Sequence, residues 1–175
     1  IGLAHDINKK ELYSHYKKIN RDAPINFFKI ANKFGVKKFI HLSTILVYGN
    51  INFNKPITES QNCIPNGIYA KSKLECDNIL MQLKKSSKTN LCIIRLPLVL
   101  GKNPKGNLHS LLKYCNSNIP LPFKHINNLK SYITIKTLYD FIVFFILKHN
   151  SENNIFLISE NENLSLEKLI LIYKK

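Results

Sequence analysis

Arginine is scarce in this chain. Only Arg21 and Arg95 are arginine among 26 basic residues, and the other 24 are lysine. Against 11 acidic residues this gives a formal net charge of +15. Such a charge raises the possibility of a nucleic-acid binder, which would show a steep salt-dependent affinity. The lysines are spread along the whole chain, however, so a diffuse lysine-rich surface is the better interpretation and we expect no nucleic-acid partner.

Metal-binding patterns and long apolar runs are also lacking. The four cysteines show neither a CxxC nor a metal-knuckle spacing, and His41, His109 and His125 show no ligand spacing. We therefore expect no metal, free thiols in a reducing cytoplasm, and histidines that are structural or on the surface. The most apolar run, residues 141–147, is far shorter than the ~20 residues of a membrane span. No segment resembles a signal peptide, so we expect no membrane insertion.

A methionine start is missing as well. The chain begins at Ile1, on an apolar segment typical of the end of a strand, and stops at Lys175 within a helical pattern. Both ends look cut, which predicts a part of a longer protein. Its 175 residues, 45% of them hydrophobic, are enough for one globular domain with a core.

Strand and helix patterns alternate along the chain. We expect strands at residues 1–4, 36–42, 91–96, 131–135 and 154–158. We expect helices at residues 8–19, 24–34, 69–85, 108–115 and 137–148, and a last helix capped by Ser165. This alternation predicts an α/β fold with a parallel sheet.

A tyrosine and a lysine stand four residues apart at the start of the 69–85 helix. Tyr69 and Lys73 would share one helix face, and an ammonium close to a phenol lowers the phenol's pKa. Such a tyrosine can exchange a proton with a sugar or alcohol hydroxyl. The spacing alone is weak, because Tyr13/Lys17 and Tyr132/Lys136 share it and a solvated helix face explains any such pair.

Strand ends distinguish Tyr69 from the other tyrosines. Ser43 and Thr44 follow the 36–42 strand, and Leu96–Leu98 follow the 91–96 strand. In parallel sheets, ligands bind beyond the carboxyl ends of the strands. Because Tyr69 begins the helix between these two strands, we expect the three segments to meet in one crevice.

Several short motifs occur in a fixed order. They are V-K-K-F-I-H-L-S-T (36–44), V-Y-G (47–49), P-I-T-E (56–59), P-N-G-I-Y-A-K-S-K (65–73) and R-L-P with V-L-G (95–101). Together they resemble the extended short-chain dehydrogenase/reductases, in particular the NAD-dependent nucleotide-sugar epimerase/dehydratase group. The resemblance covers nearly the whole chain. It implies the C-terminal part of a Rossmann-type parallel sheet (residues 1–105) plus part of a small nucleotide-sugar-binding lobe (residues 106–175).

The resemblance also implies roles for single residues. Tyr69 would be the catalytic acid/base, Lys73 its partner on the nicotinamide ribose, and Thr44 the hydroxyl that meets the sugar. The dinucleotide would be lined by Leu3, Ala4, Asn20, Leu42, Leu96 and Pro97, together with Tyr69 and Lys73. The nucleotide-sugar would be contacted by Thr44, Leu98, Asn107 and Lys130. Thr44 and Asn20 could instead be caps, and Pro97 a turn former.

Some family features are replaced or missing. Lys130, Ser131 and Thr137 stand where the family has arginine, aspartate and aspartate, and the glycine-rich dinucleotide loop is absent from the sequence. Lysine can meet a diphosphate but loses arginine's bidentate geometry. The chain therefore carries the catalytic half of such a site without its phosphate cradle.

The resemblance points to an NAD-dependent 4-epimerase similar to UDP-glucose 4-epimerases, acting through a 4-keto sugar, with NADP as a possible cofactor. Such enzymes serve polysaccharide biosynthesis. A UDP-4-keto-6-deoxy-sugar (N-acetylhexosamine) 4-reductase and an inactive truncated remnant are the alternatives. It further implies a homodimer paired through the helices at residues 24–34 and 69–85.

Overall fold

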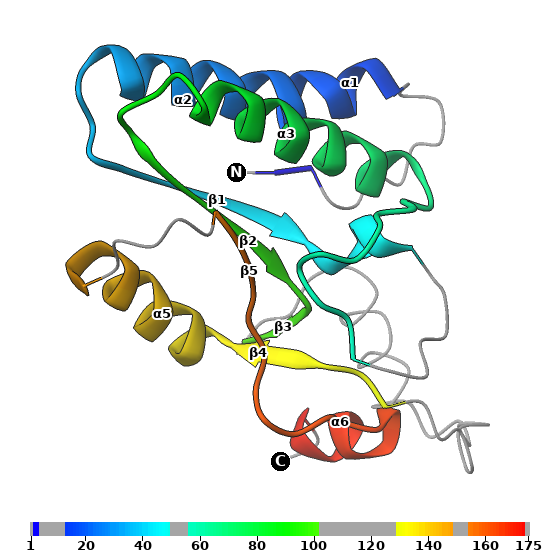
Figure 1. Ribbon diagram of the computed structural model, residues 1–175. Helices are drawn as coiled ribbons and strands as arrows, with labels where there is room; N and C mark the ends of the chain where they lie inside the picture. The colour runs from blue at the N-terminus through cyan, green and yellow to red at the C-terminus, as the bar shows by residue number, and fades with distance from the viewer. Residues whose placement is uncertain (1, 4–12, 50–55, 102–128, 149–153, 174–175) are drawn as a thin grey trace. The chain divides into compact units, whose positions relative to one another are not determined.

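The computed structural model describes residues 2–3, 13–49, 56–101, 129–148 and 154–173 (Figure 1). They form two compact units. One comprises Ile1–Leu96 with Phe145–Ile158, and the other comprises Pro97–Phe144 with Ser159–Lys175. The chain leaves the first unit after Leu96 and returns to it within helix α5 (Ile135–Lys148). The predicted domain boundary at residue 105 lies outside the described residues.

The first unit is built on a parallel sheet, as the sequence predicted. Its strands are β1 (Lys38–Thr44), β2 (Asn90–Leu96) and β5 (Ile155–Leu157), in the order β1-β2-β5. Thr44 pairs with Leu96, so β1 and β2 end at the same level. The predicted 36–42 strand lies two residues too early. Gly35, at φ 69°, ends the preceding helix, and the chain turns through exposed Val36 before it pairs.

The first helices differ from the prediction of two separate segments. α1 (Tyr13–Lys17), the π-helical turn η1 (Lys18–Asp22) and α2 (Ala23–Lys33) run on as one helical stretch. Pro24 has no N–H to donate, which predicted a helix start. The wider π-turn accommodates it, because the N–H of Ala23 bonds the carbonyl of Lys18 five residues back. Residues 8–12 and the predicted 108–115 helix lie outside the described residues.

Helices α2 and α3 (Ile68–Lys84) lie side by side over one face of β1 and β2 (Figure 1). Between them and the strands lies a cluster of buried residues, namely Ile25, Phe28, Cys76, Leu80, Leu91 and Ile93. Each fully buried large apolar side chain contributes about 1.5–3 kcal/mol. This packing fixes the first turns of α3 over the carboxyl ends of the strands.

The second unit contains a parallel pair of short strands, β3 (Leu98–Leu100) and β4 (Tyr132–Thr134), and helix α6 (Leu166–Tyr173). The Tyr173 hydroxyl donates to the carbonyl of Gly101 (2.9 Å) and accepts from its N–H (3.2 Å). Ser165 accepts the N–H of Lys168 at 3.2 Å, which confirms the predicted cap. β3 was not predicted, although β4 and β5 (Ile155–Leu157), which are equally short, were.

Among the residues described, none of the helices combines the length and the apolar character that a membrane span requires. Three cysteines lie in the described ranges, Cys63, Cys76 and Cys92, and all are free thiols. Within the same ranges, no three His, Cys, Asp or Glu side chains gather as they would around a metal ion.

Candidate active site

Tyr69 lies in the first turn of α3, at the position the sequence predicted. The preceding Gly67 has φ 85°, a left-handed conformation that glycine adopts without strain, and it lets the chain turn into the helix. Tyr69 is half-buried. Burial raises the pKa of its phenol, and a hydrogen bond with Thr44 opposes that rise. The structure therefore brings together Tyr69, which the family resemblance makes the acid/base, and Thr44, which it makes the partner of the sugar hydroxyl.

Thr44 is the last residue of β1 and is buried. Its Oγ1 also accepts the N–H of Leu46 at 3.3 Å, at the start of the 3-10 helix η2 (Ile45–Tyr48). Thr44 is therefore a cap as well as a partner of Tyr69. The cap holds the Thr44 side chain in place, and the hydroxyl can still donate one hydrogen bond.

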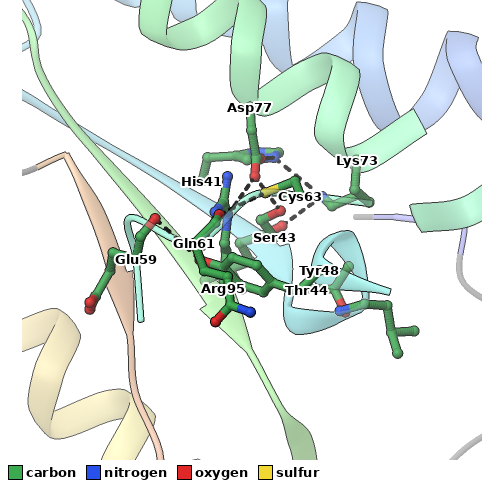
Figure 2. A network of polar contacts seen from close by, with 12 residues as sticks. His41, Ser43, Thr44, Tyr48, Glu59, Gln61, Cys63, Lys73, Asp77 and Arg95 are labelled. Carbon is green, nitrogen blue, oxygen red and sulfur yellow. Dashed lines mark hydrogen bonds and ion pairs between the residues drawn. The ribbon is translucent and has the colours of Figure 1, made fainter. Parts of the chain in front are cut away.

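Lys73 lies one turn after Tyr69 and is also buried. Its ammonium donates to the carbonyl of Leu42 at 2.6 Å and meets Nε2 of His41 at 3.2 Å (Figure 2). Burial lowers the pKa of Lys73, while Cys76 and Asp77 raise it. An ammonium has three N–H groups, and the described residues accept two of them.

One expectation for this pair was wrong. The sequence predicted that Lys73 lowers the pKa of Tyr69, yet that pKa is raised, and burial is the largest cause. Across the described residues, the Lys73 ammonium bonds β1 and not the phenol. The i, i+4 spacing places the two side chains on one face, but the acceptors beside β1 decide where the ammonium lies.

Asn20 joins the first turn of α3 to the start of the chain. Its Oδ1 accepts the N–H of Leu3 (2.8 Å), and its Nδ2 donates to the Leu3 carbonyl (2.9 Å) and to Ser72 Oγ (3.2 Å). Ser72 Oγ in turn donates to the carbonyl of Tyr69 at 2.7 Å. Both amide hydrogens are used, so Asn20 has a structural task here. Its contact with a dinucleotide stays a prediction.

A buried ionic network lies under Lys73 (Figure 2). Asp77 Oδ2 accepts from Arg95 Nε at 3.1 Å and from Ser43 Oγ at 3.0 Å. Arg95 Nη1 donates to the Tyr48 hydroxyl at 2.7 Å. Burial raises the pKa of Asp77, and Arg95, Ser43 and Lys73 each lower it. The network ties α3, β1, β2 and η2 together at the carboxyl end of the strands.

Of these network residues, sequence reasoning placed Ser43 at the crevice, and it predicted none of the contacts among them. A signal was present, because Asp77 follows Lys73 by one helical turn, and His41 and Ser43 alternate on one face of β1. Arg95 stands alone in an apolar strand, where an unpaired charge would be costly. His41 was interpreted as structural or on the surface, and the structure buries it against Lys73.

The other predicted residues are placed as follows. Leu42 is 43% exposed near the end of β1, and Leu96 is half-buried opposite Thr44. In the second unit, Pro97 precedes β3, Leu98 pairs with Tyr132, and exposed Lys130 forms an antiparallel bridge with Leu164. Ala4 and Asn107 lie outside the described residues. Contacts of all these residues with a dinucleotide or a nucleotide-sugar stay predictions.

The chain was compared with known protein families and proteins. The sequence profile described as the NAD dependent epimerase/dehydratase family matches residues 2–158. The chain belongs to this family. The resemblance noted in the sequence and the predicted fold class are thereby confirmed.

Two of the proteins to which this chain is similar are named 4-epimerases. A UDP-glucose 4-epimerase of Vibrio cholerae is 33% identical over 95% of this chain and 52% of its own length. The N-acetyl-alpha-D-glucosaminyl-diphospho-ditrans,octacis-undecaprenol 4-epimerase of Escherichia coli O157:H7 is 29% identical over 74% of this chain and 39% of its own length. The chain thus spans about half the length, or less, of these relatives.

Solved structures of the family share the fold. UDP-glucuronic acid 4-epimerase from Bacillus cereus, solved in complex with NAD, has a TM-score of 0.81 and 21% identity. The match covers 97% of this chain and 55% of that one. The Bordetella bronchiseptica enzyme WbmG, solved with NAD and UDP, has a TM-score of 0.78 and 20% identity, over 98% and 53% of the two chains.

Proposed function

We propose that this chain supplies the acid–base residues of an NAD-dependent nucleotide-sugar 4-epimerase, with a UDP-sugar as substrate. The observation that carries the proposal is the placement of Tyr69, in the first turn of α3, with Thr44 at the carboxyl end of β1 and buried Lys73 one helical turn further on. The Thr44 hydroxyl lowers the pKa of the Tyr69 phenol against the effect of burial. The similarity to the Vibrio cholerae UDP-glucose 4-epimerase, over nearly the whole chain, supports the choice of reaction.

The described residues fit the nicotinamide-ribose end of a dinucleotide. Within the described residues, one N–H of the Lys73 ammonium has no acceptor, and the Leu42 side chain is half-exposed near the end of β1. A ribose diol needs such a donor, and a nicotinamide ring needs such a surface. Lys73, Tyr69, Leu42 and Leu96 would hold that end. When bound, NAD supplies the acceptor and later the donor of the sugar's C4 hydride.

In the proposed mechanism the chain's own groups position the sugar and move one proton. The Tyr69 phenolate removes the proton of the sugar 4-hydroxyl, and the Thr44 hydroxyl holds that oxygen. The 4-keto sugar then turns over, and Tyr69 returns the proton to O4 on the other face. Because Tyr69 must be ionised to accept this proton, its ionisation sets the acidic limb of the pH profile.

The test uses the native protein that contains this chain, with UDP-glucose and NAD. Tyr69→Phe keeps the ring and removes the proton carrier, so we expect conversion of UDP-glucose to its 4-epimer to fall by about 10²–10⁴-fold. Tyr13→Phe is the matched control, since Tyr13 also precedes a lysine by four residues but bonds Glu75 on the surface of α3. It should keep wild-type turnover.

Two results would contradict the proposal. One is substantial turnover by Tyr69→Phe. The other is a wild-type protein that consumes NADH or NADPH in proportion to a 4-keto sugar and does not interconvert 4-epimers, which would make it a reductase.

A further inference from the structure

His41 lies on β1 between the two charged groups of α3. It is 5% exposed, and its Nε2 is 3.2 Å from the Lys73 ammonium and 3.7 Å from Asp77 Oδ1. Figure 2 shows the ring beneath α3, with both side chains reaching down toward it. The acid–base mechanism above gives this ring no task, although it contacts Lys73 directly.

The imidazole is neutral. Burial, together with the smaller effect of the nearby Lys73 ammonium, lowers the pKa of His41 to about 3. An ammonium has only hydrogens to offer, so Nε2 must be the acceptor and the ring proton stands on Nδ1. The 3.7 Å approach of Nε2 to Asp77 is therefore not an ion pair. This accounts for Asp77 Oδ1, which is buried without a hydrogen bond among the described residues.

We propose that His41 is a positioning residue for Lys73. Its neutral ring and the Leu42 carbonyl bind two of the three ammonium N–H groups, and this fixes the direction of the third toward a ligand hydroxyl. The role of the third N–H in binding a ligand rests on the proposed function. The hydrogen bond between His41 and the ammonium is independent of that function.

The acceptor matters because Lys73 is buried. Burial favours the uncharged amine, and each lost hydrogen bond to the ammonium favours it more. The titratable groups that act on Lys73 are His41 on β1 and Cys76 and Asp77 on α3, and Asp77 in turn pairs with Arg95 on β2. Of these, His41 is the group that accepts a hydrogen bond from the ammonium within the described part of the chain.

Two substitutions of His41 distinguish the effect of losing the hydrogen-bond acceptor from the effect of losing the volume of the ring. His41→Phe keeps a planar ring and removes the acceptor. His41→Gln offers a carbonyl oxygen to the ammonium. His15→Phe is the matched control, because half-buried His15 on α1 has no part in the site. Thermal unfolding of each variant records whether the fold is kept.

The first readout is the titration of the Lys73 ammonium, followed by ¹³Cε and ¹⁵Nζ NMR in the native protein without NAD or sugar. We expect His41→Phe to lower the Lys73 pKa by about one unit, a tenfold change in the ammonium equilibrium, and His41→Gln to restore most of it. His15→Phe should leave the titration where it is in the wild type. An unchanged titration in His41→Phe overturns the proposal.

The second readout is 4-epimerase activity against pH. In His41→Phe we expect kcat to fall about tenfold, with little change in KM for the UDP-sugar, and the alkaline limb to move to lower pH. A fall in stability and activity with an unchanged limb means that His41 is merely structural, and this also overturns the proposal. A protein with no epimerase activity whose Lys73 titration still follows His41 refutes the proposed function alone.

Discussion

Arg95 and Asp77 form an ion pair whose side chains are 4% and 1% exposed. A buried pair is not in itself evidence of high stability, because desolvation offsets the Coulomb attraction. Here each partner has additional hydrogen bonds, from Ser43 to Asp77 and from Arg95 to Tyr48. These bonds offset part of the desolvation cost while both members are present, and the pair fixes α3 against β1 and β2 beside Lys73.

Removal of one member is the costly change. Asp77→Ala leaves the Arg95 guanidinium buried without its anion, and we expect the free energy of unfolding to fall by about 3–5 kcal/mol. Asp140→Ala is the control, because Asp140 pairs with Lys136 on an exposed helix face. Removal of this exposed pair should change the free energy of unfolding by no more than the experimental error. Urea unfolding of the native protein measures both. Equal small losses would show that the buried pair does not stabilise the site.

At the scale of elements, helix α5 begins on a small polar cluster. Thr134 Oγ1 caps the helix by accepting the N–H of Thr137 at 3.2 Å. Glu160 accepts from the Thr134 N–H (3.0 Å), Thr134 Oγ1 (2.9 Å) and Thr137 Oγ1 (2.6 Å). A carboxylate at a helix N-terminus is favoured by the helix dipole. Thr137 stands where the family resemblance implied aspartate, so Glu160 supplies the negative charge from another segment.

This carboxylate makes stability depend on pH. The hydrogen bond from Thr137, followed by those from Thr134, lowers the pKa of Glu160 below its ordinary value of 4.5. The carboxylate's contribution to the free energy of unfolding is complete above pH 4.5. That contribution is lost as the pH falls through the lower pKa that Glu160 has in the folded state. We expect Glu160→Gln to be less stable than wild type at pH 7 and to lose less stability on acidification. Thermal unfolding from pH 7 to about pH 3 measures this.

Glu162→Gln is the control for this element. Glu162 is exposed near Glu160 and makes no hydrogen bond within the described ranges. Its substitution should leave the pH dependence of the unfolding temperature as it is in the wild type. If Glu160→Gln and Glu162→Gln behave alike, the carboxylate at α5 has no special role.

At the scale of the whole molecule, the outer face of α2 carries exposed aromatic and aliphatic side chains. Phe27, Ile30 and Phe34 are 61%, 52% and 75% exposed and follow the i, i+3, i+7 spacing of one helix face. An apolar stripe of this kind is typical of an interface. It agrees with the homodimer that the family resemblance implies, in which the helices at residues 24–34 and 69–85 of two copies pair.

A charge on that face should dissociate the dimer. We expect the native protein to sediment as a dimer at micromolar concentration and Phe27→Glu to sediment as a monomer, because a buried unpaired carboxylate is costly. Leu147→Glu is the control, since Leu147 is 71% exposed and lies on α5. A monomeric wild type, or a dimer that tolerates Phe27→Glu, would refute the pairing through α2.

The sequence was informative where a structure depends on neighbours along the chain. β2 and α3 lie close to their predicted ranges, Ser165 caps α6, and Tyr69 begins α3 between two parallel strands. The signals were local: apolar runs, a helix period and a capping side chain. Their physical causes act over a few residues, so no tertiary information was needed to place the Tyr69–Thr44 pair near the strand ends.

Tertiary structure decided the contacts that join distant residues. Lys73 meets His41 across 32 positions, Arg95 meets Asp77 across 18, and Thr137 meets Glu160 across 23. It also decided that burial raises the pKa of Tyr69, and that a π-turn carries the helix past Pro24. The sequence by itself determined the family, the parallel sheet and the position of Tyr69 and Thr44, the pair proposed to act on the sugar. The partners and the protonation states of the charged groups in the site depend on burial and on hydrogen-bond acceptors from other strands. Burial and these acceptors exist only in the folded chain.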